Sequence, residues 1–380
     1  MPNGQATPLS STAGGPPVSG SVMSPVVAGW ARTGAIVTSR RRWLVLIGLL
    51  AASVVVVLVS SCFGAARVSG RDLLAALLQL GTAGHIDGAV DETTGAILFQ
   101  IRLPRVLMGF LVGGTLAIVG ATLQALLRNA LADPYVLGVS SGAALGVAIA
   151  MLLGIGTMLA VVPVLPLWGF AGGVMALMLI YRLAQSRGRL PIHSLLLAGV
   201  ILNAMLTAVI MFITSIMDPA RSAGLMAWLM GSLTVQNWSG LAGIALYVAI
   251  GSLVLLHQAP ALNLLTQGED TARSLGIDTE RIKQRLYVLT ALLTGAVVSV
   301  SGMIGFIGML IPHAVRMAIG SDHRLLMPAS ACVGGIFLVL SDTVARTAFA
   351  PAEIPVGVVT ALAGGPFFLY LLLWRKDRMV

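Results

Sequence analysis

Long, uninterrupted apolar runs constrain this chain more than any other feature of its sequence. A helix that crosses the hydrocarbon layer of a membrane needs about 20 apolar residues. The six clearest runs cover Trp43–Phe63, Phe110–Leu127, Leu195–Met217, Leu241–Leu256, Leu286–Val300 and Val356–Trp374. They do not alternate between apolar and polar residues as barrel strands do, and a spanning helix satisfies its own backbone amides. The sequence therefore predicts an all-α polytopic membrane protein.

The scarcity of charge supports the same fold class. Charged residues make up 10% of the chain and hydrophobic residues 57%, whereas soluble domains carry about 25% charged residues. The net charge of +9 comes mostly from arginines in short connections between apolar runs. That distribution orients membrane helices and does not indicate nucleic-acid binding. Cys62 and Cys332 lie in apolar segments and are interpreted as small buried hydrophobes.

The first 39 residues differ in composition from the rest. They are rich in Gly, Pro, Ser, Ala and Thr, contain no acidic residue, and lead into Arg40-Arg41-Arg42. We expect a disordered cytoplasmic tail over 1–39 and a transmembrane domain over 40–380. A cleaved signal peptide is the alternative, but the apolar stretch from Trp43 exceeds the usual core of about 7–15 residues, which favours a retained first helix.

Apolar runs and polar connections together predict ten transmembrane helices with both termini in the cytoplasm. The expected spans are 43–65, 101–128, 135–153, 167–181, 194–217, 239–256, a seventh that ends near 301, 305–319, 326–345 and 355–374. Seventeen of the 23 basic residues are then cytoplasmic, and the flipped orientation would invert the ratio. Short external helices are expected near 73–80 and 225–230.

One pair of predicted helices suggests an internal repeat. Leu111–Gly120 and Leu293–Gly302 carry glycines at the same spacing of seven residues, and the two helices run in opposite directions. Inverted repeats are common in transporters. Two glycine-rich packing faces could also arise independently, because small residues let membrane helices approach closely. The residues alone leave both interpretations open.

The sequence lacks the motifs of nucleotide binding and of zinc-protease helices. It contains no G-x-x-x-x-G-K-[S/T], no dinucleotide-binding glycine pattern and no H-E-x-x-H. If ATP drives this protein, another chain binds it. An ion-coupled secondary transporter, the alternative, would need ionisable groups near mid-membrane. Only Asp342 comes close, and its spacing to Arg346 indicates an intrahelical i,i+4 pair.

Three arginines on the predicted outer side run against the orientation rule. Arg102 and Arg105 flank Leu103-Pro104 where the second helix begins, and Arg346 lies at the outer end of the ninth. They could reach toward lipid phosphates. The functional alternative is a docking surface, where guanidinium groups bind the carboxylates of an acidic partner.

A polar segment between the sixth and seventh helices is the strongest candidate on the inner side. Residues 268–277, GEDTARSLGI, predict a short helix closed by Gly276 in a left-handed C-cap. It is either a solvated loop helix or an element that fits a groove on a motor subunit. The five histidines lie near helix ends as interfacial or capping residues, and His193 opens the fifth helix at its cytoplasmic mouth.

In combination, these segments resemble the FecCD-type permeases of ABC importers, which carry cobalamin, haem and ferric siderophores. The resemblance runs from about Ile101 to Arg375 through motifs in order: RLPR (102–105), LVGGTLAIVGATLQ (111–124), RNALADPYVLGVSSGAALG (128–146), LLLAG (195–199), GEDTARSLGI (268–277), GFIGMLIPHAVR (305–316), DHRLLMPAS (322–330) and EIPVGVVTALAGGPFFLYLL (353–372). The chain departs from the family at Asn129-Ala130, usually Asn-Pro, and at Gly364-Gly365-Pro366, commonly Gly-Ala-Pro.

The resemblance implies a permease domain over 40–380, with an inverted repeat relating helices two to five with seven to ten. It implies a homodimer in the lipid of the bacterial inner membrane, with an alternating-access pathway at the subunit interface. Two ATPase subunits would bind ATP and Mg²⁺ inside, so this chain is expected to hold no cofactor or metal and to be a transport subunit, not an enzyme. A periplasmic substrate-binding protein would dock outside. The segments 351–357 and 322–330 are closer to the haem and cobalamin branch, so haem is favoured over cobalamin or a ferric siderophore.

The resemblance also assigns roles to residues. The binding protein is expected to dock on Arg102, Arg105 and Arg346. The residues expected to contact the ATPase are Gly268, Glu269, Ala272, Arg273, Leu275 and Gly276. Helix five is expected to line the pathway, through Ile192, His193, Leu196, Gly199 and Asn203.

Overall fold

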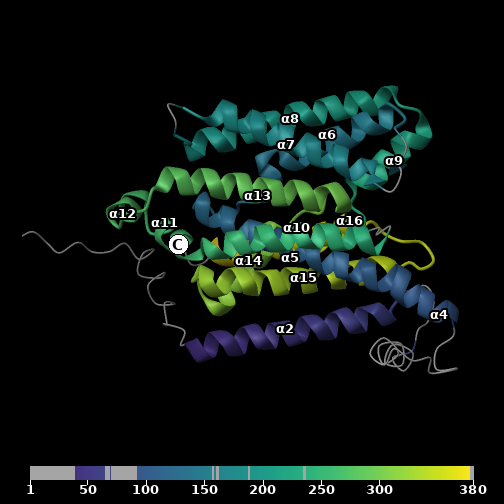
Figure 1. Ribbon diagram of the computed structural model, residues 1–380, viewed down its shortest axis with the longest axis horizontal. Coiled ribbons are helices and arrows are strands. Elements are labelled where there is room, and N and C mark those ends of the chain that lie inside the picture. Colours follow the sequence, from purple (N-terminus) through teal and green to yellow (C-terminus); the bar gives the residue numbers. More distant parts are fainter. Residues whose placement is uncertain are drawn as a thin grey trace, which may run out of the picture. The chain divides into compact units, whose positions relative to one another are not determined.

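The computed structural model describes residues 39–64, 69, 92–155, 158–159, 162–186, 189–233 and 237–376. Helices make up nearly all regular structure in these residues, so the all-α class is confirmed (Figure 1). The predicted tail before Ser39 and the predicted helix at 73–80 lie outside the described residues.

Seven described helices are long and apolar enough to cross a membrane. They are α2 (Ser39–Cys62), α5 (Leu103–Leu126), α7 (Val164–Ala184), α8 (Ile192–Ile216), α10 (Trp238–His257), α13 (Thr279–Ser301) and α15 (His323–Thr347). Three further helices are α6 (Val139–Leu152), α14 (Ile307–Ile319) and α16 (Val356–Lys376). All ten lie where the sequence predicts a span. Of these three, α6 and α14 are too short to establish a crossing by length alone, and so is the part of α16 that could be assessed, Val356–Tyr370.

Shorter elements connect these helices. They are α4 (Glu92–Ala96), the π-helix η1 (Ile97–Arg102), the 3₁₀-helix η2 (Pro134–Leu137), α9 (Pro219–Leu229), α11 (Ala259–Leu265), α12 (Glu269–Ser274) and the antiparallel two-residue strands β1 (Met158–Leu159) and β2 (Val162–Pro163). The π-helix and the strands were not predicted. They are too short for a hydrophobic period to mark them. In Figure 1, α12 lies at one end of the bundle and α4 and α9 at the other.

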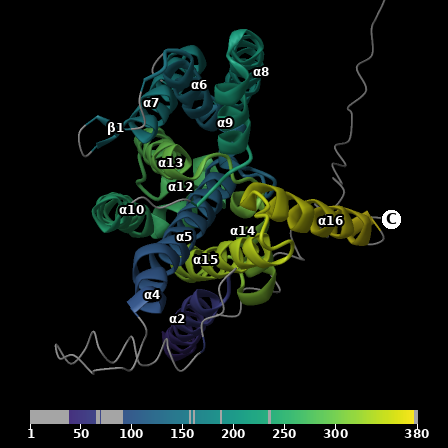
Figure 2. The same ribbon diagram turned by 90° about the vertical axis from the view of Figure 1, so that its right-hand side faces the viewer.

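The helix α5 lies at the centre of the bundle, between α15 and the group formed by α6, α7 and α8 (Figure 2). Its core positions are small. A Cβ added to Gly113 would overlap the backbone of Gly334 on α15, so only glycine permits this approach. Gly295, the repeat counterpart of Gly113, lies close to Gly173 on α7. The α5–α15 and α13–α7 pairs thus correspond, as expected for the inverted repeat.

The two short helices α6 and α14 both begin at a residue in the left-handed region, Gly138 (φ 73°) and Phe306 (φ 70°). Their entry segments contact each other. The Gln124 side-chain amide donates to the backbone carbonyl of Met309 at 2.9 Å. Asp133 accepts hydrogen bonds from the backbone N–H groups of Tyr135 and Met309. The backbone groups of Tyr135 and Met309 at these helix breaks therefore have partners within the protein, as the membrane requires.

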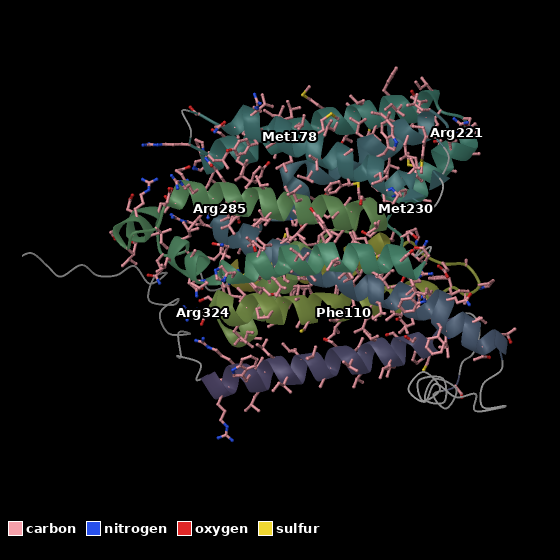
Figure 3. All side chains as sticks on the ribbon, viewed as in Figure 1. Phe110, Met178, Arg221, Met230, Arg285 and Arg324 are labelled. Atoms are coloured by element: carbon pink, nitrogen blue, oxygen red, sulfur yellow. The ribbon has the colours of Figure 1, made fainter. Side chains whose placement is uncertain are left out.

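Cationic side chains gather at the two ends of the bundle. Arg285 and Arg324 lie at the α12 end and Arg221 at the α9 end, whereas Met178 lies on the side of the bundle (Figure 3). Several large hydrophobic residues on the outer helices α2, α8 and α10 are more than half exposed. Such a surface is stable only when lipid or another apolar face covers it.

Candidate functional site

Two of the three arginines predicted for the outer side, Arg105 and Arg346, share one buried carboxylate. The Asp342 side chain is 2% exposed, and its Oδ1 accepts hydrogen bonds from Arg105 Nε at 3.1 Å and Nη2 at 2.9 Å. Its Oδ2 lies 2.9 Å from Arg346 Nε, so the predicted i,i+4 pair is confirmed. The bond to Arg105 was not predicted, because 237 residues separate it from Asp342. We call Arg102, Arg105, Asp342, Arg346 and Glu353 the arginine cluster.

Two members of the arginine cluster contact the end of α2. Arg102 Nη1 donates to the carbonyl of Cys62 at 3.0 Å, and Arg346 Nη1 to that of Phe63 at 3.0 Å. The last carbonyls of a helix have no partners within the helix and carry its negative dipole end, so guanidinium groups bind them well. Arg102 and Arg346 are each only 5% exposed. Their visible role is to cap α2.

Arg105 alone of the three presents an accessible guanidinium. Its side chain is 20% exposed, and Nη1 donates to Glu353 Oε2 at 2.9 Å. The Glu353 side chain is 53% exposed. Sequence reasoning missed Glu353. The available signal was an isolated acidic residue just before a predicted helix at the outer end.

The polar segment on the opposite end folds as predicted. Gly268 (φ 136°) precedes α12 and Gly276 (φ 83°) follows it, and the Gly276 N–H bonds the Arg273 carbonyl at 2.9 Å. Both glycines occupy backbone conformations that disfavour other residues. Within α12, Ala272 is fully buried, whereas Leu275 at the end of the helix is 60% exposed. This leaves an apolar side chain on the open surface at the end of a short polar helix.

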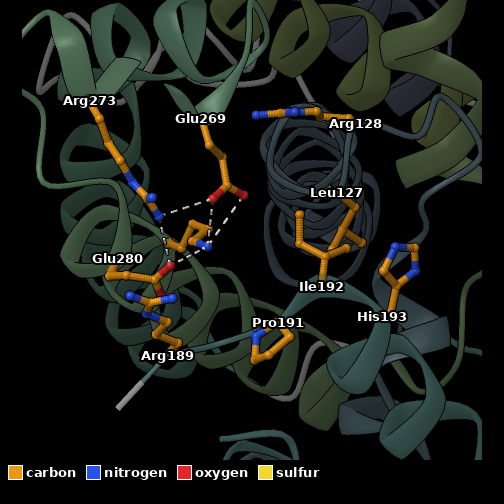
Figure 4. Close-up of a pocket in the computed structure, with 10 residues that line it drawn as sticks. Leu127, Arg128, Arg189, Pro191, Ile192, His193, Glu269, Arg273 and Glu280 are labelled. Carbon is orange, nitrogen blue, oxygen red and sulfur yellow. Dashed lines mark hydrogen bonds and ion pairs between the residues drawn. The ribbon is translucent and has the colours of Figure 1, made fainter. Parts of the chain in front are cut away.

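An ion network surrounds a buried lysine beside α12 (Figure 4). Lys283 Nζ lies 2.6 Å from Glu280 Oε1 and 3.2 Å from Glu269 Oε2. Arg273 Nη2 is 3.6 Å from each of the two carboxylates. Glu280 Oε2 also accepts the backbone N–H of Leu190 at 3.1 Å. Sequence reasoning missed Lys283 and Glu280, although their i,i+3 spacing on α13 was a local signal.

A cavity of about 500 Å³ adjoins the network. Its lining residues are Leu127, Arg128, Arg189, Pro191, Ile192, His193, Glu269, Arg273, Glu280 and Lys283. The structure thus brings two residues predicted for the pathway, Ile192 and His193, next to two predicted to contact a motor subunit, Glu269 and Arg273. Figure 4 shows both sets around the same space.

Ile192, although it lines the cavity, lies with Leu196, Gly199 and Asn203 on a different face of α8 from His193. Ile192 and Leu196 pack against the core, and Gly199 is buried. Asn203 is hydrogen-bonded to the Ser141 hydroxyl on α6. His193 is on the exposed side, where Leu197 and Val200 follow, 62% and 53% exposed. The pathway prediction remains untested.

One carboxyl in the connection from α5 to α6 has an altered acidity. Burial raises the pKa of Asp133 from 3.8 to about 6, although hydrogen bonds from the Tyr135 and Met309 backbone act to lower it. Burial disfavours the charged form because the carboxylate loses its hydration.

No group of three metal-ligating side chains occurs among the described residues.

Comparisons with known proteins place this geometry in context. A model of the FecCD transport family matches residues 49–374. The chain is 43% identical over 302 residues to a cobalamin import system permease protein of Halobacterium salinarum, covering 79% of this chain and 80% of that protein. It is 41% identical over 295 residues to a hemin transport system permease protein of Yersinia pestis, covering 76% and 87%.

A solved structure agrees with these relatives. The chain superimposes on a metal-chelate type ABC transporter in an inward-facing conformation with a TM-score of 0.74 and 31% sequence identity, covering 86% of this chain and 98% of that one. An iron(3+)-hydroxamate import system permease protein of Bacillus subtilis is 34% identical over 329 residues, covering 84% and 94%.

Proposed function

The chain belongs to the FecCD transport family, and from that premise we propose that it is the permease of an ATP-driven importer that moves haem across the bacterial inner membrane. It is a multi-pass ABC importer permease whose relatives are named for cobalamin, hemin and iron-hydroxamate import. Haem is the favoured chelate because 351–357 and 322–330 resemble the haem and cobalamin branch. Cobalamin and ferric siderophores are the alternatives.

The observation that carries this proposal is the position of two polar sites at opposite ends of one apolar bundle. At the α9 end, Arg105 presents a guanidinium that a carboxylate of a substrate-binding protein could bind. At the α12 end, Leu275 is exposed just after a short helix, and Glu269 and Arg273 of that helix belong to an ion network. A partner that binds and displaces α12 would therefore also displace α13 and α8. ATP and Mg²⁺ bind to that partner, an ATPase present in two copies.

A homodimer accounts for exposed apolar surface on α8 and α16. Met205 and Phe212 on α8 are 60% and 63% exposed, and Leu362 and Tyr370 on α16 are 70% and 61% exposed. In Figure 2, α16 extends away from the rest of the bundle. Two copies joined through these helices would enclose a pathway between them, opened to each side in turn. Lipid covers the remaining outer faces, and both termini face the cytoplasm.

Reconstitution tests the proposal. The chain is purified with its cognate ATPase and binding protein and inserted in liposomes containing ATP. We expect hemin-loaded binding protein to stimulate ATP hydrolysis and to deliver hemin to the lumen. The same assay is repeated with binding protein loaded with cobalamin or with a ferric hydroxamate. The chelate that is delivered to the lumen identifies the substrate. Uptake without ATP, driven by a proton or sodium gradient, would instead establish the ion-coupled alternative.

A further inference from the structure

A continuous set of polar contacts joins α12 to the segment that enters α8. Lys283 on α13 contacts Glu269 of α12 at 3.2 Å and Glu280 at 2.6 Å. Glu280 in turn accepts the backbone N–H of Leu190 at 3.1 Å. Leu190 lies two residues before the start of α8. The helices α12 and α13 and the distant entry of α8 are therefore connected through one ammonium group and two carboxylates.

Burial makes this connection stiff. The Lys283 side chain is 6% exposed, so its charge has little access to water. A buried ammonium that loses its carboxylate partners is strongly destabilised, which keeps Glu269 and Glu280 together. Arg273 reinforces the link from outside, because its Nε donates to Thr279 Oγ1 at 2.9 Å. Relative motion between α12 and the first turn of α13 is thereby restricted.

The cavity on the other side of the connection leaves space for the entry of α8 to move. Pro191, Ile192 and His193 form part of its wall. Pro191 is extended (ψ 128°) and α8 has no side-chain cap at this end. The Leu190 N–H bond to Glu280 is therefore the polar contact that holds this segment against α13 among the described interactions. A displacement of α12 would pass through Lys283 and Glu280 to this point.

We propose that Lys283 is a positioning residue that fastens α12 to the entry of α8, so that movement of α12 by a partner moves α8. The inference rests on the proposed function, because it requires an ATPase that contacts α12. Coupling between distant sites needs a physical element that both sites bias. Here that element is the Glu269–Lys283–Glu280–Leu190 connection.

The test compares variants in the complete reconstituted complex. Lys283→Met removes the buried charge, and Glu280→Ala removes the bridge to Leu190 but leaves Lys283 its partner Glu269. Arg281→Met is the matched control, because it breaks an exposed ion pair with Asp278 on the same helix. Chelate uptake and ATP hydrolysis are measured in the same liposomes. We expect chelate transported per ATP to fall about fivefold or more in both test variants and to stay unchanged in the control.

A distance measurement separates positioning from mere loss of stability. Spin labels are placed at Ser274 and His193, both exposed, after replacement of Cys62 and Cys332 by alanine. Binding of ATP should shift the label distance distribution in the otherwise unchanged complex. In the Lys283→Met and Glu280→Ala complexes that shift should be lost while the ATPase stays bound. Protein that is only less stable would give less complex but an unchanged shift.

The outcomes distinguish this inference from the proposed function. Failure of the unmodified complex to bind the ATPase or to import a chelate would reject the proposed function. Normal import by the unmodified complex, with the same chelate-to-ATP ratio in Lys283→Met and Glu280→Ala, would overturn only the role of Lys283. Glu280→Ala decides the question if Lys283→Met does not assemble.

Discussion

At the scale of single residues, Asp342 explains why Arg105 and Arg346 can lie close together. Its carboxylate neutralises part of the repulsion between Arg105 and Arg346, with both of its oxygens engaged. A charge this deeply buried must be paired, and removal of one partner costs about 3–5 kcal/mol. Asp342 therefore serves to hold the packing of Arg105 and Arg346 at this end of the bundle.

In the proposed function, Glu353 would compete with a carboxylate of the binding protein for Arg105. Its ion pair is exposed enough to contribute only about 0–1 kcal/mol, so a binding protein could displace it. We expect Glu353→Gln to tighten docking by roughly threefold, since less competition remains, and Arg105→Ala to weaken docking strongly. Surface plasmon resonance with the immobilised permease complex measures both. Asp218→Asn, which breaks another exposed ion pair at the same end with Arg221, is the control and should leave docking unchanged.

Asp133 makes a pH-dependent contribution to stability. Its folded-state pKa, about 6, lies above the ordinary value of 3.8. The folded state therefore binds the proton more tightly, and stability is gained as pH falls from 6 to 4 and lost as pH rises through the same window. Asp133→Asn should raise the apparent melting temperature in detergent by a few degrees at pH 7.5 and by much less at pH 5.

The control for this effect is another carboxylate that caps a helix. Asp278→Asn changes an exposed cap of α13 that accepts the Arg281 N–H at 3.1 Å. It should shift the melting temperature equally at the two pH values. A stabilisation by Asp133→Asn that is the same at pH 5 and pH 7.5 would contradict the assignment.

At the scale of elements, the α5–α15 contact and its repeat counterpart, α13–α7, differ in how closely their backbones approach. Gly113 has no room for a methyl group against Gly334, whereas a Cβ on Gly295 would be 3.7 Å from its nearest neighbour, an ordinary contact. The two halves of the inverted repeat thus pair corresponding helices, but the two contacts differ in how large a side chain they accept. Overpacking in such a contact typically costs about 1–3 kcal/mol.

We therefore expect three glycine-to-alanine variants to behave differently. Gly113→Ala should lower the apparent melting temperature by several degrees, because α5 and α15 must separate. Gly295→Ala should have little effect. Gly48→Ala on α2, where nothing lies within 4 Å of the added Cβ, should be neutral or slightly stabilising, since alanine favours the helix. Equal losses at Gly113 and Gly295 would show that the approach distance is not what limits substitution.

At the scale of the whole molecule, what the sequence could predict depended on how local each signal was. The positions of the helices follow from runs of apolar residues, and the Gly276 cap and the Asp342–Arg346 pair from spacings within one turn. No short-range sequence pattern predicts the contact between Arg105 and Asp342, which are 237 residues apart, or that between Leu190 and Glu280, which are 90 residues apart. The burial of Arg102 and Arg346 under the end of α2 also depends on tertiary packing, so the sequence could not distinguish a cap from an exposed docking residue.

The capping of α2 by distant arginines has a consequence for biosynthesis. The ribosome makes α2 first among the described helices, but the guanidinium that binds the Phe63 carbonyl belongs to a residue made 283 positions later. Until α15 has been made and packed, the Phe63 carbonyl at the end of α2 lacks this partner. A nascent protein cut short before Arg346 would lack the hydrogen bond to the Phe63 carbonyl, so the end of α2 acquires its full set of partners only after α15 is made.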